Sequence, residues 1–304
     1  MNDVEFGIGL RGLDNVAADA REAEALGYEY VCTGEHVFFH GPVGNGLIAL
    51  AAAAGATERI RMMSTITLAP LYPAALLAKQ VASLDRVSGG RFSLGVGVGG
   101  EFPKEFEACG VPVGERGART DESLDILGRL CREDNLHYQG RFNTLSGVTL
   151  GPKPVQQPHP PIWISGRSEA AMRRCARFGT GWLPYMYTPE KLKDSIGWIE
   201  RVAAPLDRPA PVRPGLFIFF AVHEDRDTGV KMAVERLSLQ YNQDFSALVG
   251  KYALAGSPDD VISRLREYID AGARTIMLNS ACPSDYVAEN ERLLAKAVMP
   301  ALRG

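Results

Sequence analysis

The chain has 304 residues, of which 46% are hydrophobic and 23% are charged, a composition typical of a globular protein with a large core. Its formal net charge of −3 creates no field that favours nucleic acid or an anionic membrane as a partner. No apolar run approaches the ~18 residues of a membrane span, and the first ten residues lack the basic start of a signal peptide. We therefore expect a cytoplasmic protein with neither nucleic acid nor a membrane as a partner.

The cysteines are scattered along the chain and form no CxxC pair. They are Cys32, Cys109, Cys131, Cys175 and Cys282. Their odd number and wide spacing disfavour both a disulfide framework and a zinc site. We expect no metal in this protein, and we interpret Cys32 and Cys175 as buried, inert thiols.

Eight short apolar runs with little polar alternation predict strands that are buried on both faces. They cover residues 5–10, 30–34, 60–68, 91–98, 161–165, 181–184, 215–222 and 274–279. Predicted helices cover residues 13–26, 46–55, 73–87, 117–131, 168–178 and 259–271, with a last helix near 286–299. Thr188-Pro189 and Ser257-Pro258 mark helix starts, because each sets an N-cap residue before a proline. This alternation predicts one α/β domain over residues 1–304, a (β/α)8 TIM barrel.

Two long segments, 100–116 and 133–160, interrupt this rhythm, and both are rich in glycine, proline and polar residues. Long segments in a barrel are usually functional caps or interface elements. We expect both segments near the C-terminal face of the strands, where the chemistry of such barrels takes place.

The connection after the fifth predicted strand has the features of a phosphate site. The apolar run ends at Gly166, and Ser168 stands where the N-cap of the next helix belongs. A strand, a glycine turn and a free helix N-terminus together bind phosphate well, and Arg167 adds a permanent positive charge. The alternative is an ordinary strand-to-helix connection with a good cap.

Residues 95–100, GVGVGG, formally match the G-x-G-x-x-G dinucleotide fingerprint, and Asp121 lies about 20 residues further on. We disfavour nicotinamide binding, because these glycines lie inside a predicted strand and not in a turn that opens a helix. Gly97 and Gly99 are instead interpreted as bare backbone against which a planar ligand lies.

Several motifs together resemble the luciferase-like flavin-dependent oxidoreductases. They are Glu35-His36, the LDRVSGGR element at 84–91, the GVG strand at 95–97, and the segments 105–112, 115–122 and 161–171. The resemblance spans most of the chain. It implies a (β/α)8 barrel that binds FMN or the 5-deazaflavin coenzyme F420 at the C-terminal ends of its strands.

The resemblance implies positions for the cofactor. Its phosphate would lie at Gly166, Arg167 and Ser168. Arg119 matches an arginine that approaches the phosphate in some relatives, although it is equally well interpreted as an exposed helix charge. Strand three of relatives often carries a non-prolyl cis peptide that supports the flavin ring, here within residues 64–68. Thr65 and Thr67 would offer hydroxyls to that ring, or they are plain strand formers.

The resemblance also implies that an acidic residue and a histidine, here Glu35 and His36, lie beside the reacting face of the cofactor. His36 follows strand two, at the barrel end where catalysis occurs, and histidine titrates near neutral pH. The alternative is a histidine fixed within the loop 36–45. His40 is a weaker candidate, and Glu101 is expected at the pocket mouth.

Two reactions fit the resemblance. In the first, coenzyme F420 exchanges a hydride with a small organic substrate. We favour this reaction because the Ala/Gly/Arg-rich composition resembles that of actinobacterial members. In the second, an FMN-dependent monooxygenase uses O₂ and FMNH₂ from a separate reductase. A non-catalytic relative is a third alternative. Many relatives are homodimers, and the apolar faces at 47–54 and 76–84 are the contacts we expect.

Overall fold

A computed structural model describes residues 4–206 and 210–303 of the chain. Eight parallel strands form a closed ring in which the last strand pairs with the first. In ring order they are β1 (Glu5–Gly9), β2 (Tyr30–Thr33), β3 (Arg61–Ser64), β5 (Phe92–Gly97), β8 (Ile162–Ile164), β9 (Gly181–Trp182), β10 (Arg213–Val222) and β12 (Thr275–Ser280). The structure therefore confirms the predicted (β/α)8 barrel, and each ring strand lies within or overlaps one of the eight predicted runs.

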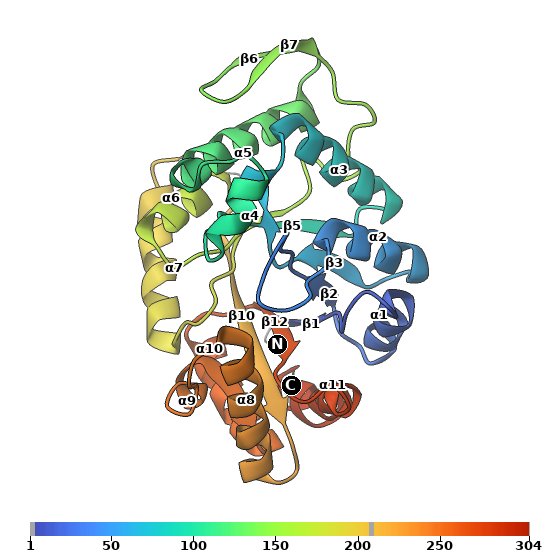
Figure 1. Cartoon of the computed structure of the whole chain (residues 1–304), viewed down its shortest axis with the longest axis vertical. Coiled ribbons are helices and arrows are strands. Elements are labelled where there is room, and N and C mark those ends of the chain that lie inside the picture. The colour runs from blue at the N-terminus through green and yellow to red at the C-terminus, as the bar shows by residue number, and fades with distance from the viewer. Residues whose placement is uncertain (1–3, 207–209, 304) are drawn as a thin grey trace.

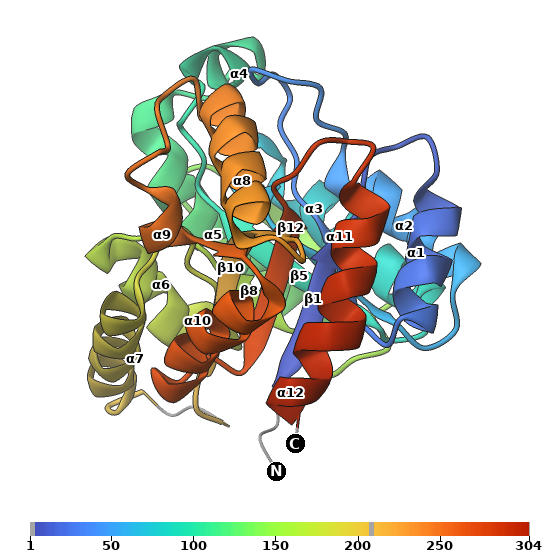
Figure 2. The same ribbon diagram turned by 90° about the horizontal axis from the view of Figure 1, so that it is seen from below.

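Helices surround the ring on its outer side (Figures 1 and 2). They are α1 (Val16–Ala25), α2 (Gly46–Ala56), α3 (Ala74–Val87), α5 (Arg116–Arg132), α6 (Glu169–Phe178), α7 (Pro189–Ala203), α8 (Arg226–Tyr241), α10 (Pro258–Asp270), α11 (Val287–Leu293) and α12 (Met299–Arg303). The cap signals act as the sequence predicts, because Thr188 accepts a bond from the Lys191 N–H and Ser257 forms a capping box with Asp260. In the part of the chain that the structure describes, no helix is long and apolar enough to cross a membrane.

The two interrupting segments lie in different places. Segment 100–116 follows the C-terminal end of β5 and contains the short helix α4 (Pro103–Ala108), as expected for the mouth of the barrel. Segment 133–160 contains a hairpin of β6 (Leu136–Gln139) and β7 (Thr144–Val148). Figure 1 shows this hairpin outside α5.

The expectation that segment 133–160 lies near the C-terminal face is therefore wrong for most of its length. Glu122 on α5 accepts bonds from the backbone N–H groups of residues 141–143 and so fixes the hairpin to the helix flank. Further along, Asp85 in the last turn of α3 accepts bonds from the Val155 and Gln156 N–H groups. That turn leads into β5, so residues 155–156 lie at the N-terminal end of the ring.

A charged cluster fills the N-terminal end of the barrel interior. The Glu5 carboxylate lies 2.6 Å from an Arg61 nitrogen and 2.9 Å from an Arg213 nitrogen. The Arg61 guanidinium covers the Tyr30 ring at 4.0 Å, and Thr275 donates a hydrogen bond to Glu5. One carboxylate thus serves several donors, and the charges at this end compensate one another.

The LDRVSGGR element also lies at the N-terminal end. Asp85 is fully buried and takes bonds from Val155 and Gln156 at 2.6–2.9 Å. Arg91 donates to the carbonyl oxygens of Ala54, Thr57 and Ile60 at 2.9–3.1 Å. These charged residues therefore join α2, α3 and the loop before β8, and they do not face the mouth.

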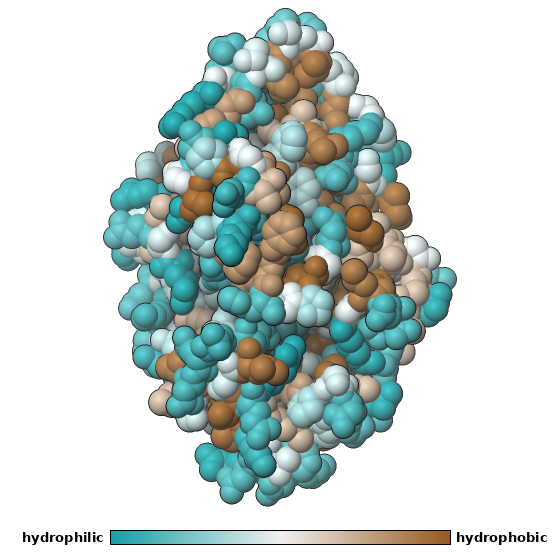
Figure 3. Space-filling model, in the orientation of Figure 1, coloured by the Kyte–Doolittle hydropathy of each residue, from teal (hydrophilic) through white to brown (hydrophobic). Residues whose placement is uncertain are grey.

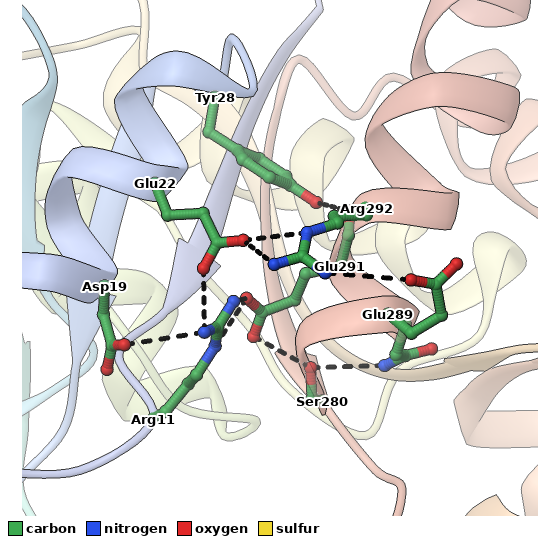
Figure 4. Close-up of polar contacts among 9 residues, drawn as sticks. Arg11, Asp19, Glu22, Tyr28, Ser280, Glu289, Glu291 and Arg292 are labelled. Carbon is green, nitrogen blue, oxygen red and sulfur yellow. Dashed lines mark hydrogen bonds and ion pairs between the residues drawn. The ribbon is translucent and has the colours of Figure 1, made fainter. Parts of the chain in front are cut away.

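Polar contacts also join the first and last helices of the ring (Figure 4). Arg11, just after β1, pairs with Glu22 at 2.9 Å and with the buried Glu291 at 2.6 Å. Arg292 pairs with Glu22 at 2.6 Å. These contacts connect α1 to α11 where β1 meets β12, so they hold the ring closed.

Candidate active site

The N-terminus of α6 opens toward the mouth of the barrel. Gly166 has φ +144°, and a Cβ at this position would lie 2.6 Å from the Ala171 Cβ, so the turn requires glycine. Ser168 caps the helix by accepting the Ala171 N–H, and both Arg167 and Ser168 are exposed. The first turn therefore presents N–H groups and about half a positive charge to any anion there.

A cavity of about 300 Å³ lies beside this helix start. Its aromatic wall consists of Phe39, Tyr185, Tyr241, Phe245 and Tyr252. Its two charged lining residues are Glu101 and Arg167, and His40 also lines it. The expectation that Glu101 lines the pocket mouth is met. A volume of this size suits a small ligand that contacts both apolar and polar groups.

Within the cavity, Tyr185 connects the two charges. The Arg167 guanidinium lies over the Tyr185 ring at 4.9 Å from its centroid, and the Tyr185 hydroxyl donates a hydrogen bond to Glu101. Burial and the bond to Glu101 raise the pKa of Tyr185 well above its ordinary value. Tyr185 therefore remains a neutral donor to the Glu101 carboxylate at physiological pH.

His36 follows β2 and is fixed by a buried carboxylate. Its Nδ1 lies 3.2 Å from both carboxylate oxygens of Glu105, which is fully buried in α4, and the Val37 N–H donates to the same group at 3.1 Å. Phe39 stacks on the imidazole at 4.2 Å. Since a carboxylate accepts hydrogen bonds, Nδ1 is assigned the proton, which leaves Nε2 for acid–base chemistry. Phe39 also lines the cavity, so His36 stands directly behind one of its walls.

Glu35 has a different environment from its neighbour. It is 7% exposed and accepts bonds from the Leu68 N–H at 3.0 Å, the Tyr72 hydroxyl at 2.9 Å and the Asn45 amide at 3.3 Å. Burial raises its pKa against the opposing effect of these bonds. These contacts join the loop after β2 to the start of α2 and to β4 (Thr67–Leu68), so Glu35 positions the loop that carries His36.

The strand-three region contains the expected backbone feature. The Thr65–Ile66 peptide is cis, within the predicted residues 64–68, and separates β3 from β4. Thr65 is half-buried at this point. Thr67 is fully buried, and its hydroxyl has no hydrogen-bond partner among the described residues. A buried hydroxyl without a partner is unusual and fits a polar group supplied by a ligand.

The role of Gly97 and Gly99 as bare backbone against a ligand stays a prediction, and the structure shows which protein side chains approach them. A Cβ on Gly97 would lie 2.2 Å from Ile66 Cδ1, and one on Gly99 would lie 2.8 Å from Leu68 Cδ2. These glycines make room for the side chains that follow the cis peptide. The sequence could not reveal this, because it depends on which residues pack opposite the strand.

The two arginines at the start of α5 have different surroundings. Arg119 pairs with Glu115 at 2.9 Å and lies over the Phe142 ring at 4.4 Å, so its charge is directed to the hairpin. Arg116 lies beside Gly100, where a Cβ would be 2.9 Å from its Nε, and that Nε is buried without a hydrogen-bond partner in the described chain. Sequence reasoning missed Arg116, and the only available signal was its place three residues before Arg119.

Residues 5–275 match the model of the luciferase-like monooxygenase family. The chain belongs to this family. Over the described residues, no group of three or more His, Cys, Asp or Glu side chains is placed to hold a metal ion.

Two curated relatives match part of this luciferase-like chain. An uncharacterised protein of Mycobacterium tuberculosis is 34% identical over 185 residues, which cover 60% of this chain and 63% of that protein. The FMNH₂-dependent dimethylsulfone monooxygenase of Pseudomonas putida is 35% identical over 156 residues, or 50% of this chain and 42% of the enzyme. The chain thus spans less than two thirds of the length of these relatives.

Solved structures match nearly the whole chain. The monooxygenase RslO1 from Streptomyces bottropensis has a TM-score of 0.84 and 25% identity, with 98% of this chain and 99% of that chain covered. An F420-dependent secondary alcohol dehydrogenase, solved with an F420–acetone adduct, has a TM-score of 0.85 at 19% identity, with 99% of each chain covered. At that identity the second likeness shows the fold alone.

Proposed function

We propose that this chain is a coenzyme F420-dependent oxidoreductase that transfers a hydride to or from a small organic substrate with a hydroxyl or carbonyl group. The observation that carries the proposal is His36, held by the buried Glu105 at the mouth of the barrel. Oxidation of an alcohol carbon releases a hydride and a hydroxyl proton together. A histidine in a fixed orientation accepts that proton, and it returns one in the reverse direction.

The residues present fit a flavin-type cofactor. Its phosphate would meet the open N-terminus of α6, with Arg167 and Ser168 adding charge-assisted hydrogen bonds. The unpartnered Thr67 hydroxyl and Arg116 Nε at the ends of β4 and α5 offer two further donors. The bound deazaflavin would supply hydride transfer, while the protein binds, orients and handles the proton.

Glu105 acts on His36 as a positioning residue. Its two oxygens lie at equal distances of 3.2 Å from Nδ1, so the carboxylate accepts the Nδ1 proton and fixes the orientation of the ring. The Phe39 ring restricts the other face of the imidazole. In the oxidation direction the substrate O–H bond would break and its proton would pass to Nε2, while the bound deazaflavin would supply the acceptor for the hydride from the C–H bond.

The proposal is tested by two measurements in sequence. Oxidised F420 and FMN are first titrated into the protein by fluorescence and absorbance. The protein is then mixed with F420 under anaerobic conditions and a panel of alcohols, aldehydes and ketones. We expect F420 to bind and one substrate class to change its absorbance without oxygen. Failure of both cofactors to bind would instead support the non-catalytic alternative.

An FMN-dependent monooxygenase is the second candidate, and the comparisons favour it on one point. The P. putida relative that uses FMNH₂ is 35% identical over 156 residues, and RslO1 is a monooxygenase. In that case the aromatic cavity wall would exclude water from the reacting oxygen, and a separate reductase would supply reduced FMN. Product formation only with reduced FMN and oxygen would select this candidate over the first.

We also propose a homodimer that forms through α2 and α3. α2 contains no charged residue, Ile48 on its outer side is 72% exposed, and Leu76 on α3 is 49% exposed. Figure 3 shows apolar residues on the side of the molecule where these two helices lie. A helix that is apolar on all sides is normally covered. Light scattering at micromolar concentration should give the dimer mass, and a monomer mass would contradict this proposal.

A further inference from the structure

The cavity beside α6 has an uneven distribution of charge and aromatic surface. The rings of Phe39, Tyr185, Tyr241, Phe245 and Tyr252 form one part of its wall. Tyr241 and Phe245 lie 5.4 Å apart and tilted, and Phe219 meets Tyr241 edge-on at 6.0 Å. These rings support one another, so the wall presents several π faces in fixed positions to whatever enters the cavity.

The negative charge of this cavity is not held in an ion pair. Glu101 forms no ion pair among the described residues, and the hydrogen bond it accepts comes from the neutral Tyr185 hydroxyl. A carboxylate has room for further donors beyond this one. The nearby cation, Arg167, belongs to the phosphate site in the proposed function, so the inference rests on that proposal. Once Arg167 binds the phosphate, Glu101 is the charge that faces the substrate.

We infer that this cavity selects a substrate that carries a protonated amine on a ring skeleton, with Glu101 as the counter-charge. Aromatic faces attract a cation through the ring quadrupole, and Tyr185 already accepts the Arg167 guanidinium on its face. The same rings bury the apolar skeleton of the ligand. An anionic substrate would meet the Glu101 carboxylate and be disfavoured, so one residue sets the charge preference of the site.

The test compares two probes of the same shape. Binding of 2-phenylethylamine and of 2-phenylethanol is measured by calorimetry at neutral pH, on the full chain saturated with F420. The amine should bind roughly tenfold more tightly than the alcohol. In Glu101→Gln, which keeps the shape and removes the charge, most of the preference for the amine should be lost, and only the attraction of the rings should remain. The matched control is Glu107→Gln, an exposed residue in the same segment, which should keep the full preference.

Three results would overturn the inference. They are equal binding of the two probes to the wild type, an amine preference in Glu101→Gln that is as large as in the wild type, and no binding of either probe at millimolar concentration. Thermal unfolding of Glu101→Gln checks that the variant is folded. F420 binding is recorded in the same samples. Normal F420 binding without an amine preference overturns this inference alone, whereas an amine preference in a protein that binds neither F420 nor FMN overturns the proposed function alone.

Discussion

The two ends of the barrel treat charged groups in opposite ways. At the N-terminal end, Glu5 lies between Arg61 and Arg213, and Asp85 takes several hydrogen bonds from residues 155–156. At the C-terminal end, the first turn of α6 is exposed and Arg167 rests on a ring face. The comparison teaches that charged side chains whose partners lie within the protein stabilise the fold. Charged groups with an incomplete set of partners indicate where a ligand binds.

The mouth also contains fully bonded carboxylates, and these refine the comparison. Glu35 and Glu105 are buried, and each accepts several hydrogen bonds from the loop after β2 or its neighbours. Neither lines the cavity. They hold His36 in place, so the hydrogen-bonded carboxylates at this end support the histidine to which the proposed function assigns the proton transfer.

The largest effect should come from His36→Asn. The asparagine amide keeps a donor where Nδ1 meets Glu105, but it removes Nε2. We expect kcat to fall by ~10²–10⁴-fold with little change in cofactor affinity or melting temperature. The measurement is steady-state kinetics with the substrate found by the anaerobic screen. An unchanged kcat would show that His36 holds the loop and does not transfer a proton.

The next effect tests the opposite end. Asp85→Ala removes the acceptor for the Val155 and Gln156 N–H groups and should lower the free energy of unfolding by about 3 kcal/mol. Urea unfolding monitored by circular dichroism measures it. Asp134→Ala is the control, because Asp134 is mostly exposed and pairs only with Lys153 at 3.1 Å; it should change stability by less than ~0.5 kcal/mol. Equal losses in the two variants would contradict the distinction between the ends.

A smaller effect is expected at the phosphate site. Ser168→Ala removes a hydroxyl donor and should weaken cofactor binding by roughly 1–2 kcal/mol, about tenfold. It also removes a helix cap, so Ser257→Ala is the matched control, since Ser257 caps α10 and does not line the cavity. Both variants should lose ~1 kcal/mol of stability, but only Ser168→Ala should lose cofactor affinity. A similar loss of affinity in both would refute a specific role for Ser168.

The smallest effect concerns the hairpin outside α5. Burial raises the pKa of Glu122, but the bonds from Asn143 and from the neighbouring backbone N–H groups outweigh it and lower the pKa below 4.5. The stability that Glu122 contributes is therefore present above pH 4.5 and is lost as pH falls through the folded-state pKa. Hydrogen exchange of residues 136–148 should accelerate below that pH in the wild type. Exchange that is independent of pH, after correction for the intrinsic rate, would argue against this attachment.

The strands and helices could be predicted from the sequence because buried parallel strands read as short apolar runs and because caps such as Ser168 and Ser257 have local signals. The hairpin could not, since most residues of β7 are exposed and its pattern has no buried face. Long segments usually mark function, but nothing in segment 133–160 indicates that Asp85 and Glu122 fix it.

The site was partly predictable. His36 and the glycine–arginine–serine turn stand at strand ends, so their place at the mouth follows from the fold. The role of Glu105 does not, because it lies 69 residues from His36 on a six-residue helix without a strong local signal. The neighbours of Gly97 and Arg119, which are Ile66 and Phe142, could not be predicted either, because they come from other elements and meet these residues only in the folded chain.

The central claim is that the mouth of the barrel binds a flavin-type cofactor through the start of α6. The most direct measurement is the melting temperature with and without saturating F420, and again with FMN, for the wild type and for Arg167→Ala. A ligand that binds only the folded state raises the melting temperature by mass action. We predict an increase for the wild type and little or none for Arg167→Ala. No increase with either cofactor, or an equal increase in both proteins, would contradict the account.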